Sequence, residues 1–187
     1  MAEFIPFDFS LHKSLLVDLN EEYFTWMDSE MQQRYDIDIF ELLKLEDTFE
    51  NSKQERKAKI RRYSTMTVEY WKSIKPPLGI YYLLQVRDKM TGMGAFFRKS
   101  ESDLGWVKRM YVKPTNRGKG YGKAMLQQLI KKAKQFGCLT IQLETAKFME
   151  TAQHVYREAG FQFRDEYSDT EVPPPQRALW LFMEKTL

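Results

Sequence analysis

The chain has 187 residues, a net charge of +3 at neutral pH and 43% hydrophobic residues, values that fit a single globular domain with a substantial core and exclude a disordered chain. Its single cysteine, Cys138, excludes an intrachain disulfide, and with only His12 and His154 as further soft ligands the sequence predicts no metal site. No apolar run reaches the ~20 residues of a membrane span, and Glu3 and Asp8 interrupt the N-terminal apolar residues, so we expect a cytoplasmic protein that does not enter a membrane.

The first 77 residues are expected to be mainly helical. Apolar side chains recur there at helical spacing, Ser10 can cap the first helix, and Pro76 and Pro77 end the region. The expected elements are a strand at Glu3–Asp8, a helix from Ser10 to about Trp26, an amphipathic helix at Ile37–Phe49, and a charge-rich, partly helical segment at Ser52–Ile74.

From Gly79 onward the pattern changes to strands alternating with helices. Strand, helix and strand in succession predict a right-handed βαβ unit whose two strands are parallel, and Gly137 is placed to end the longer helix. The expected elements are strands at Ile80–Val86 and Met93–Arg98 joined by a turn at Asp88–Gly92, a strand at Leu104–Val112, a helix at Gly120–Phe136, a strand at Leu139–Leu143, a helix at Met149–Ala159, and strands at Phe161–Tyr167 and Ala178–Glu184 separated by the proline loop Val172–Arg177.

The most informative segment joins the strand ending at Val112 to the helix after Gly120, and we call Lys113–Gly122 the glycine loop. Its alternating glycines let a ligand approach the backbone, and the following helix N-terminus favours an anion such as phosphate. A nucleoside-triphosphate P-loop is excluded, because Arg117 and Ala124 occupy positions where that motif needs glycine and Ser or Thr. The dinucleotide motif G-x-G-x-x-G also fails, at Lys123.

The spacing that does fit is Arg-x-x-Gly-x-Gly, at Arg117, Gly120 and Gly122. With it, the chain resembles the GNAT superfamily of acetyl-CoA-dependent N-acetyltransferases. A second match, Ala152–Phe161, is similar to a later helix of that superfamily and lies at the usual separation. The resemblance covers roughly Leu78–Leu187 and implies an α/β fold, a mixed sheet flanked by helices, of the GNAT-like acyl-CoA N-acyltransferase type.

The resemblance also implies how acetyl-CoA is bound. The glycine loop would hold the pyrophosphate through backbone N–H groups, and the pantetheine arm would pair with the strand before it. A backbone N–H near Met110 would meet the acetyl oxygen. The implied cofactor-binding residues are Met110, Tyr111, Val112, Arg117, Gly118, Lys119, Gly120, Tyr121, Gly122 and Lys123. Each lysine of the loop, Lys113 included, is either a phosphate contact or a solvated surface charge.

For catalysis, the resemblance implies that Tyr156 protonates the leaving thiolate, although its place in an apolar stripe also fits a core aromatic. The general base is less defined. Trp106 occupies a position where relatives often have Glu, so the usual base is missing. The remaining candidates are Glu144 and Asp103, and each of them can equally be a structural or surface residue. We select Glu144. A second departure is Met149, where many members carry an Asn that contacts the cofactor.

The sequence thus predicts one domain over residues 1–187, with an acceptor-side region at 1–77 and a cofactor-binding core at 78–187. The expected function is direct transfer of the acetyl group from acetyl-CoA to an amine, more readily of a small molecule than of a protein. The alternatives are a non-catalytic acyl-CoA sensor and a weak nucleic-acid binder that uses Lys53–Arg62, which a solvated helix face explains more simply. The resemblance is compatible with a homodimer.

Overall fold

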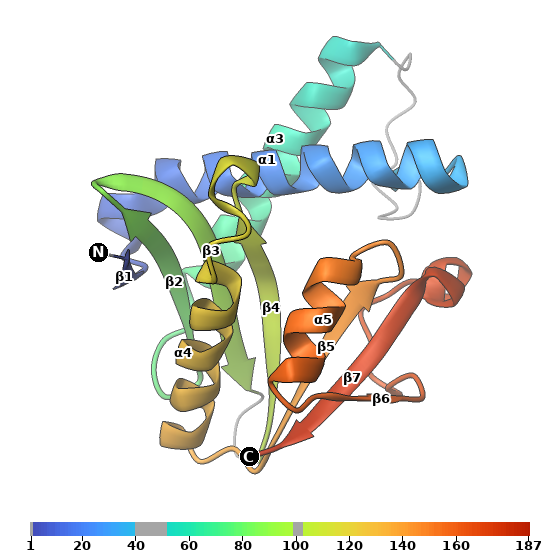
Figure 1. The fold of residues 1–187 in the computed structure, drawn as a ribbon. Coiled ribbons are helices and arrows are strands. Elements are labelled where there is room, and N and C mark those ends of the chain that lie inside the picture. Colours follow the sequence, from blue (N-terminus) through green and yellow to red (C-terminus); the bar gives the residue numbers. More distant parts are fainter. Residues whose placement is uncertain (1, 40–51, 99–102) are drawn as a thin grey trace.

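A computed structural model describes residues 2–39, 52–98 and 103–187, and its centre is a seven-stranded sheet in the order β1-β2-β3-β4-β5-β7-β6 (Figure 1). Neighbouring strands are antiparallel except β4 and β5, which form the predicted parallel pair. The strands are β1 (Ala2–Pro6), β2 (Gly79–Val86), β3 (Lys89–Arg98), β4 (Leu104–Val112), β5 (Thr140–Ala146), β6 (Gln162–Arg164) and β7 (Trp180–Thr186).

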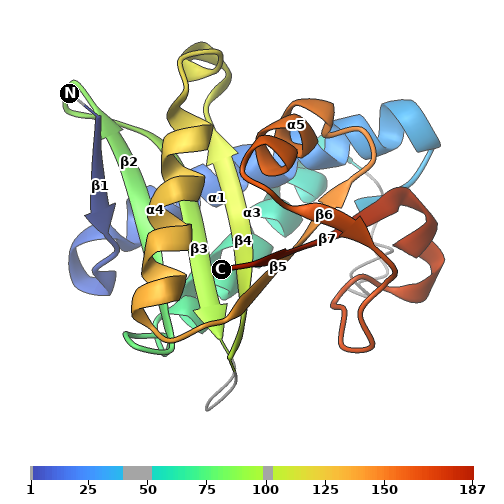
Figure 2. The ribbon, with the colours of Figure 1, turned by 60° about the horizontal axis from the view of Figure 1, so that its bottom comes forward.

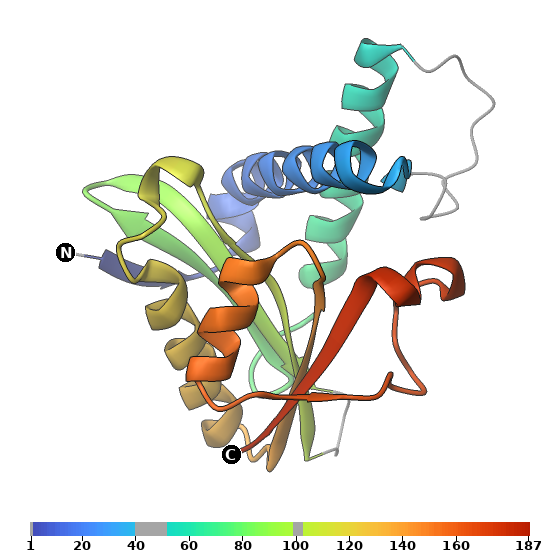
Figure 3. The same cartoon turned by 45° about the vertical axis from the view of Figure 1, so that its right-hand side comes forward.

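Helices cover both faces of the sheet, as the mixed α/β prediction requires (Figure 2). On one face, α4 and α5 lie side by side and close a core that includes Phe96, Leu126 and Ile141 (Figure 3). On the other face, α1 and α3 pack over β2, β3 and β4. The helices are α1 (Phe9–Tyr35), α3 (Lys53–Trp71), α4 (Tyr121–Gln135) and α5 (Glu150–Glu158), with 3-10 turns η1 (Pro114–Asn116) and η2 (Pro174–Leu179).

The first helix differs from the prediction at both ends. Asp8, not Ser10, is its N-cap, and the Asp8 carboxylate accepts from the backbone N–H groups of Ser10 at 2.9 Å and Leu11 at 3.1 Å. The helix also continues nine residues past Trp26, because no Gly or Pro interrupts it and Met27 and Met31 keep its inner face buried. No helix among the described residues is long and apolar enough to cross a membrane.

The charge-rich segment is helical throughout Lys53–Trp71 and starts with a capping box between Ser52 and Glu55. Arg56 ties this helix to α1 through the buried carboxylate of Asp28 at 2.5 Å. Of the predicted helix at Ile37–Phe49, residues 40–49 lie outside the described part of the chain.

The hairpin between β2 and β3 is tighter than predicted. Arg87 and Asp88 form a two-residue turn with φ of 49° and 60°, so the residues from Lys89 to Gly92 belong to β3 and not to a turn. Strand β6 is in turn shorter than the predicted Phe161–Tyr167, and the predicted strand start at Ala178 belongs to η2. The predicted helix after the glycine loop is confirmed to within one residue, with Gly137 beyond its end at φ 82°.

The parallel pair β4–β5 separates halfway along its length. The two strands pair only from Leu104 with Thr140 to Trp106 with Gln142, and they diverge toward the glycine loop (Figure 1). Strand β4 also bulges there, because its register with β3 shifts and Arg109 takes φ 56°. The inner edges of both strands are therefore open in front of the loop.

Candidate active site

The glycine loop follows β4 through η1 and enters α4 with its backbone exposed. Gly118 and Gly120 have φ of 73° and 78°, a conformation that glycine adopts without strain. A Cβ placed on Gly118, Gly120 or Gly122 would meet no described atom within 4 Å. Gly120 is the N-cap of α4 and supplies no side chain to its first N–H groups. These donors therefore face a space that a phosphate can fill.

Arg117 does not extend over this space. Its Nε donates to the carbonyl of Val112 at 2.9 Å, and its guanidinium lies 4.9 Å from the ring centroid of Trp26 and 5.7 Å from that of Tyr111. Arg117 thus fastens the loop to the end of β4 and to α1. Its predicted contact with the cofactor stays a prediction.

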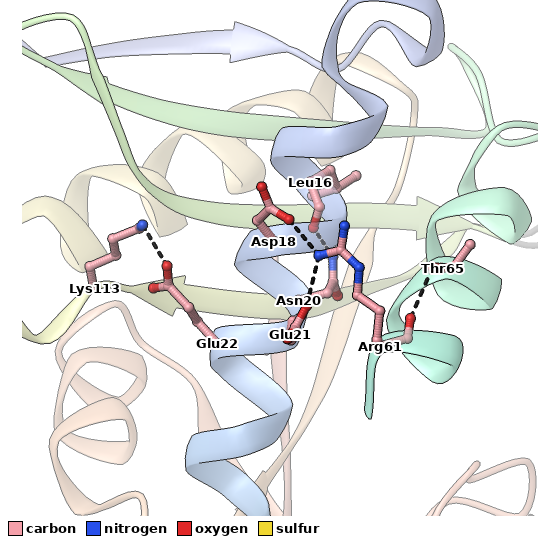
Figure 4. A network of polar contacts seen from close by, with 8 residues as sticks. All are labelled: Leu16, Asp18, Asn20, Glu21, Glu22, Arg61, Thr65 and Lys113. Carbon is pink, nitrogen blue, oxygen red and sulfur yellow. Dashed lines mark hydrogen bonds and ion pairs between the residues drawn. The ribbon is translucent and has the colours of Figure 1, made fainter. Parts of the chain in front are cut away.

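The lysines of the loop are engaged with the protein. Lys113 bonds Glu22 of α1, which Figure 4 shows beside the contacts that join α1 to α3. In that same view Arg61 of α3 bonds Asp18 at 2.5 Å and Glu21 at 2.7 Å. The remaining loop contacts are Lys119 Nζ to the carbonyl of Thr115 at 3.0 Å and Lys123 Nζ to Glu158 at 3.1 Å. Backbone donors, more than these side chains, are available to a ligand here.

The end of β4 alternates between the two faces of the sheet. Met110 and Val112 pack against the core on the α4 side, whereas Tyr111 is buried on the α1 side, with its ring centroid 5.7 Å from that of Tyr23. Because β5 has diverged at this point, the backbone of these three β4 residues borders the open edge. This is where the resemblance places the pantetheine arm.

Tyr156 lies on α5 in the core beside this opening and is 7% exposed. Its ring packs against Phe161, with centroids 6.0 Å apart, and its hydroxyl has no hydrogen-bond partner among the described residues. Burial, aided by the nearby Tyr23, raises the pKa of Tyr156 above its ordinary value. The hydroxyl therefore keeps its proton at neutral pH and can donate a hydrogen bond to a ligand.

Glu144, the predicted base, is held by an ion-pair network. Its Oε2 bonds Lys108 Nζ at 2.6 Å, and its Oε1 accepts from the Thr170 hydroxyl at 2.6 Å. Lys108 also contacts the exposed Glu171 at 3.2 Å. These contacts give Glu144 a structural role across the opening between β4 and β5, and its catalytic role stays a prediction.

The two departures from the superfamily pattern are both packing residues. Trp106 is buried and stacks on Phe97, with centroids 5.6 Å apart and planes 18° from parallel. Met149 packs in the cluster of α1 and α3 side chains.

Asp103, the other candidate base, precedes β4 at the end opposite the glycine loop, away from the opening. A shallow hollow at Phe163–Asp165 lies on β6, the far edge strand of the sheet.

One residue beside the opening has no role in the sequence-based prediction. Arg109 occupies the bulge of β4, and its guanidinium lies 5.0 Å from the ring centroid of Phe24 on α1. A signal for it exists in the sequence: Lys108 and Arg109 are two basic residues within an otherwise apolar strand, and charged residues are seldom buried without a partner.

With this geometry in view, comparison with known proteins is decisive. The sequence model of the acetyltransferase (GNAT) family matches residues 16–161, which include most of α1, the open edge, the glycine loop and Tyr156. The chain belongs to this family. The family match also extends the predicted resemblance, which began near Leu78, back into the first helix.

Relatives agree with this assignment. An IAA acetyltransferase of Azospirillum brasilense is 36% identical over 98 residues, which are 52% of this chain and 61% of that protein. The chain thus matches less than two thirds of this curated relative. The structure of PaiA N-acetyltransferase from Thermoplasma acidophilum in complex with coenzyme A has a TM-score of 0.69 at 16% identity and covers 100% of this chain and 99% of its own.

A second structure, an IAA acetyltransferase from Bacillus cereus, aligns over the full length of both chains with a TM-score of 0.59 at 11% identity. These structural neighbours confirm the predicted fold. The exposed glycine cradle and the separated strands fit the acetyl-CoA that the family uses, because both offer unpaired backbone to a phosphate-bearing, amide-containing ligand.

Proposed function

We propose that this protein is an N-acetyltransferase that transfers the acetyl group of acetyl-CoA directly to an amine. One observation carries the proposal: the open edge of β4 leads directly into an exposed glycine loop at the N-terminus of α4. The loop provides N–H donors for a pyrophosphate, and the edge provides amide pairing for an extended arm. Together they would carry the thioester to the bulge of β4.

At the bulge, the reaction needs a donor for the acetyl oxygen and an acid for the thiolate. In this proposal the backbone N–H near Met110 bonds the carbonyl oxygen as negative charge develops on it. The neutral amine nitrogen attacks the carbonyl carbon, the C–S bond breaks, and the nitrogen loses a proton to water as the amide forms. Tyr156 then gives its hydroxyl proton to the sulfur, a role for which its buried and protonated hydroxyl is placed, and the tyrosinate regains a proton from water.

The attacking amine must first lose a proton, because a free amine has a pKa of about 10. Glu144 is the predicted acceptor of that proton, yet both its oxygens are already bonded. A second route is burial of the amine among the aromatic side chains of α1, among them Tyr23 and Phe24, which lowers its pKa. We propose that this desolvation provides neutral amine, with Glu144 holding Lys108.

The alternative of a nucleic-acid binder loses support from α3. Two of its basic residues, Arg56 and Arg61, are used in ion pairs with acidic residues of α1. A sensor that binds acyl-CoA without turnover would use the same loop, and the test must therefore measure product.

The experiment is release of free coenzyme A thiol from acetyl-CoA in the presence of amine pools, compared with acetyl-CoA alone. We expect amine-dependent release from small-molecule pools that exceeds release with peptide pools. Binding of acetyl-CoA without amine-dependent release would establish the sensor instead. If the wild-type protein does not bind acetyl-CoA, both the enzyme and the sensor are ruled out.

A further inference from the structure

Arg109 presents a cation beside the opening that no carboxylate of residues 2–39, 52–98 and 103–187 bonds directly. Its Nε is sealed from solvent and has no hydrogen-bond partner, and no hydrogen bond or ion pair within the described residues engages its other nitrogens. The neighbouring Lys108, by contrast, bonds both Glu144 and Glu171. The contrast matters because a buried charge is normally paired.

Aromatic side chains surround this guanidinium. It lies over the face of Phe24. Burial opposes its charge, while Tyr63, Tyr23, Tyr81 and the more distant carboxylate of Glu171 favour it, so that the pKa of Arg109 stays above its ordinary value. The charge is therefore permanent, and the protein holds it in place with rings more than with anions.

The position of Arg109 relates it to the reaction. Tyr23 is an electrostatic neighbour of both Arg109 and Tyr156, so the candidate acid and the cation lie near the same ring. Arg109 is also adjacent in the chain to Met110, which is predicted to contact the acetyl oxygen. An acceptor whose amine reaches the thioester would thus have the guanidinium within a few bonds of its nitrogen.

We propose that Arg109 binds a carboxylate of the acceptor, so that the substrate class is a small amine that also carries a carboxylate close to the amino group. A guanidinium bonds a carboxylate through two parallel N–H donors, which fixes the orientation of the amine as well as its affinity. The inference rests on the proposed N-acetyltransferase function and adds the chemistry of the acceptor to it.

The test compares amino acids with their uncharged amides. Thiol release is measured with acetyl-CoA and L-leucine, L-phenylalanine or β-alanine, each against the corresponding carboxamide. The same pairs are run with Arg109→Met, which removes the charge and keeps a long side chain, and with Arg109→Lys, which keeps the charge without the fork. Arg34→Met is the matched control, since Arg34 lies at the end of α1, forms an exposed ion pair with Glu30 and, like Arg109, lies over an aromatic ring, that of Phe148 at 5.8 Å.

We expect the acids to be acetylated at least about 100-fold more efficiently than their amides, and Arg109→Met to abolish that preference. Arg109→Lys should retain part of it, and acetyl-CoA affinity should be unchanged in all variants. Equal rates for acids and amides in wild type would overturn the inference, as would wild-type kcat/KM for the acids in Arg109→Met. If acetyl-CoA binds and no acid reacts, the inference fails alone; if acetyl-CoA does not bind, the proposed function fails with it.

Discussion

The cofactor loop and the acceptor side meet at the end of β4, yet they present different parts of the chain to a ligand. The loop presents backbone: its three glycines leave open space, and its cationic side chains bond protein groups. The acceptor side presents side chains: an unpaired Arg109 stands among rings from α1, α3 and β2. Ligand binding at the loop therefore depends mainly on the backbone, whereas ligand binding on the acceptor side depends on which side chains are present.

This difference separates what is shared from what is specific. A cradle made of backbone N–H groups suits a phosphate-bearing cofactor that many enzymes use. Such a cradle can be predicted from the spacing of glycines in the sequence. In our proposal a side-chain cluster recognises one acceptor class, and it is assembled from distant positions such as Tyr23, Tyr63 and Arg109. The following predictions probe each half in turn.

The largest effect is expected for Gly122→Glu. Gly122 lies in the first turn of α4 without positive φ, so the change introduces no backbone strain, and a Cβ there meets open space. A carboxylate about 4 Å from a phosphate is unfavourable by about 4 kcal/mol, so acetyl-CoA affinity should fall by about 1000-fold. Calorimetric titration checks this. Gln135→Glu adds the same charge at an exposed position at the other end of α4 and should leave affinity unchanged. Similar affinity for Gly122→Glu and wild type would refute the loop assignment.

Next in size is Tyr156→Phe, which tests the junction of the two halves. Removing the donor for the thiolate should lower kcat by about 100-fold or more while acetyl-CoA affinity is unchanged. Steady-state thiol release provides the measurement. Tyr82→Phe removes another buried tyrosine hydroxyl from the same core and should retain wild-type turnover. Full activity in Tyr156→Phe would reduce Tyr156 to a packing residue.

A smaller effect is expected for Glu144→Gln, and it concerns stability. The change leaves Lys108 without its buried partner, so the free energy of unfolding should drop by about 2–3 kcal/mol, as measured by denaturant titration. Glu184→Gln on the adjacent strand breaks a more exposed pair and should have a weaker effect. A large loss of kcat with unchanged stability would instead make Glu144 the base.

The smallest expected effect is a loss of stability at alkaline pH, caused by ionisation of buried tyrosines on the acceptor side. Burial raises the pKa of Tyr23 to about 12 and also raises the pKa of Tyr81. Because these values exceed the unfolded value of about 10, their contribution to stability is complete below pH 10 and is lost as pH rises through 12. Tyrosinate absorbance should therefore appear in two phases, exposed rings first. A single phase near pH 10 would contradict the burial of this cluster.

Most of the fold follows from local signals in the sequence. Apolar periodicity and helix-ending glycines predict the strand Leu104–Val112, the helix after the glycine loop and the parallel βαβ unit. The errors fall where tertiary contacts decide the ends of elements. Helix α1 extends to Tyr35 because Met27 and Met31 are covered by other parts of the fold, and no local residue indicates this.

The candidate site divides in the same manner. The predicted cofactor residues all lie in the one segment from Met110 to Lys123, so motif spacing predicts them as a set. The acceptor cluster is not contiguous: Tyr23 and Arg109 are 86 positions apart in the chain and become neighbours only through the packing of α1 on β4. Sequence reasoning missed Arg109, because its neighbours come from distant parts of the chain.

The most direct test of the central claim is calorimetric titration of the wild-type protein with acetyl-CoA, with ATP and NAD in parallel. The open edge and the glycine cradle predict selective binding of acetyl-CoA, since ATP and NAD present phosphate to the loop but have no pantetheine arm for the edge of β4. Binding of all three ligands with equal affinity, or of none, would contradict the account.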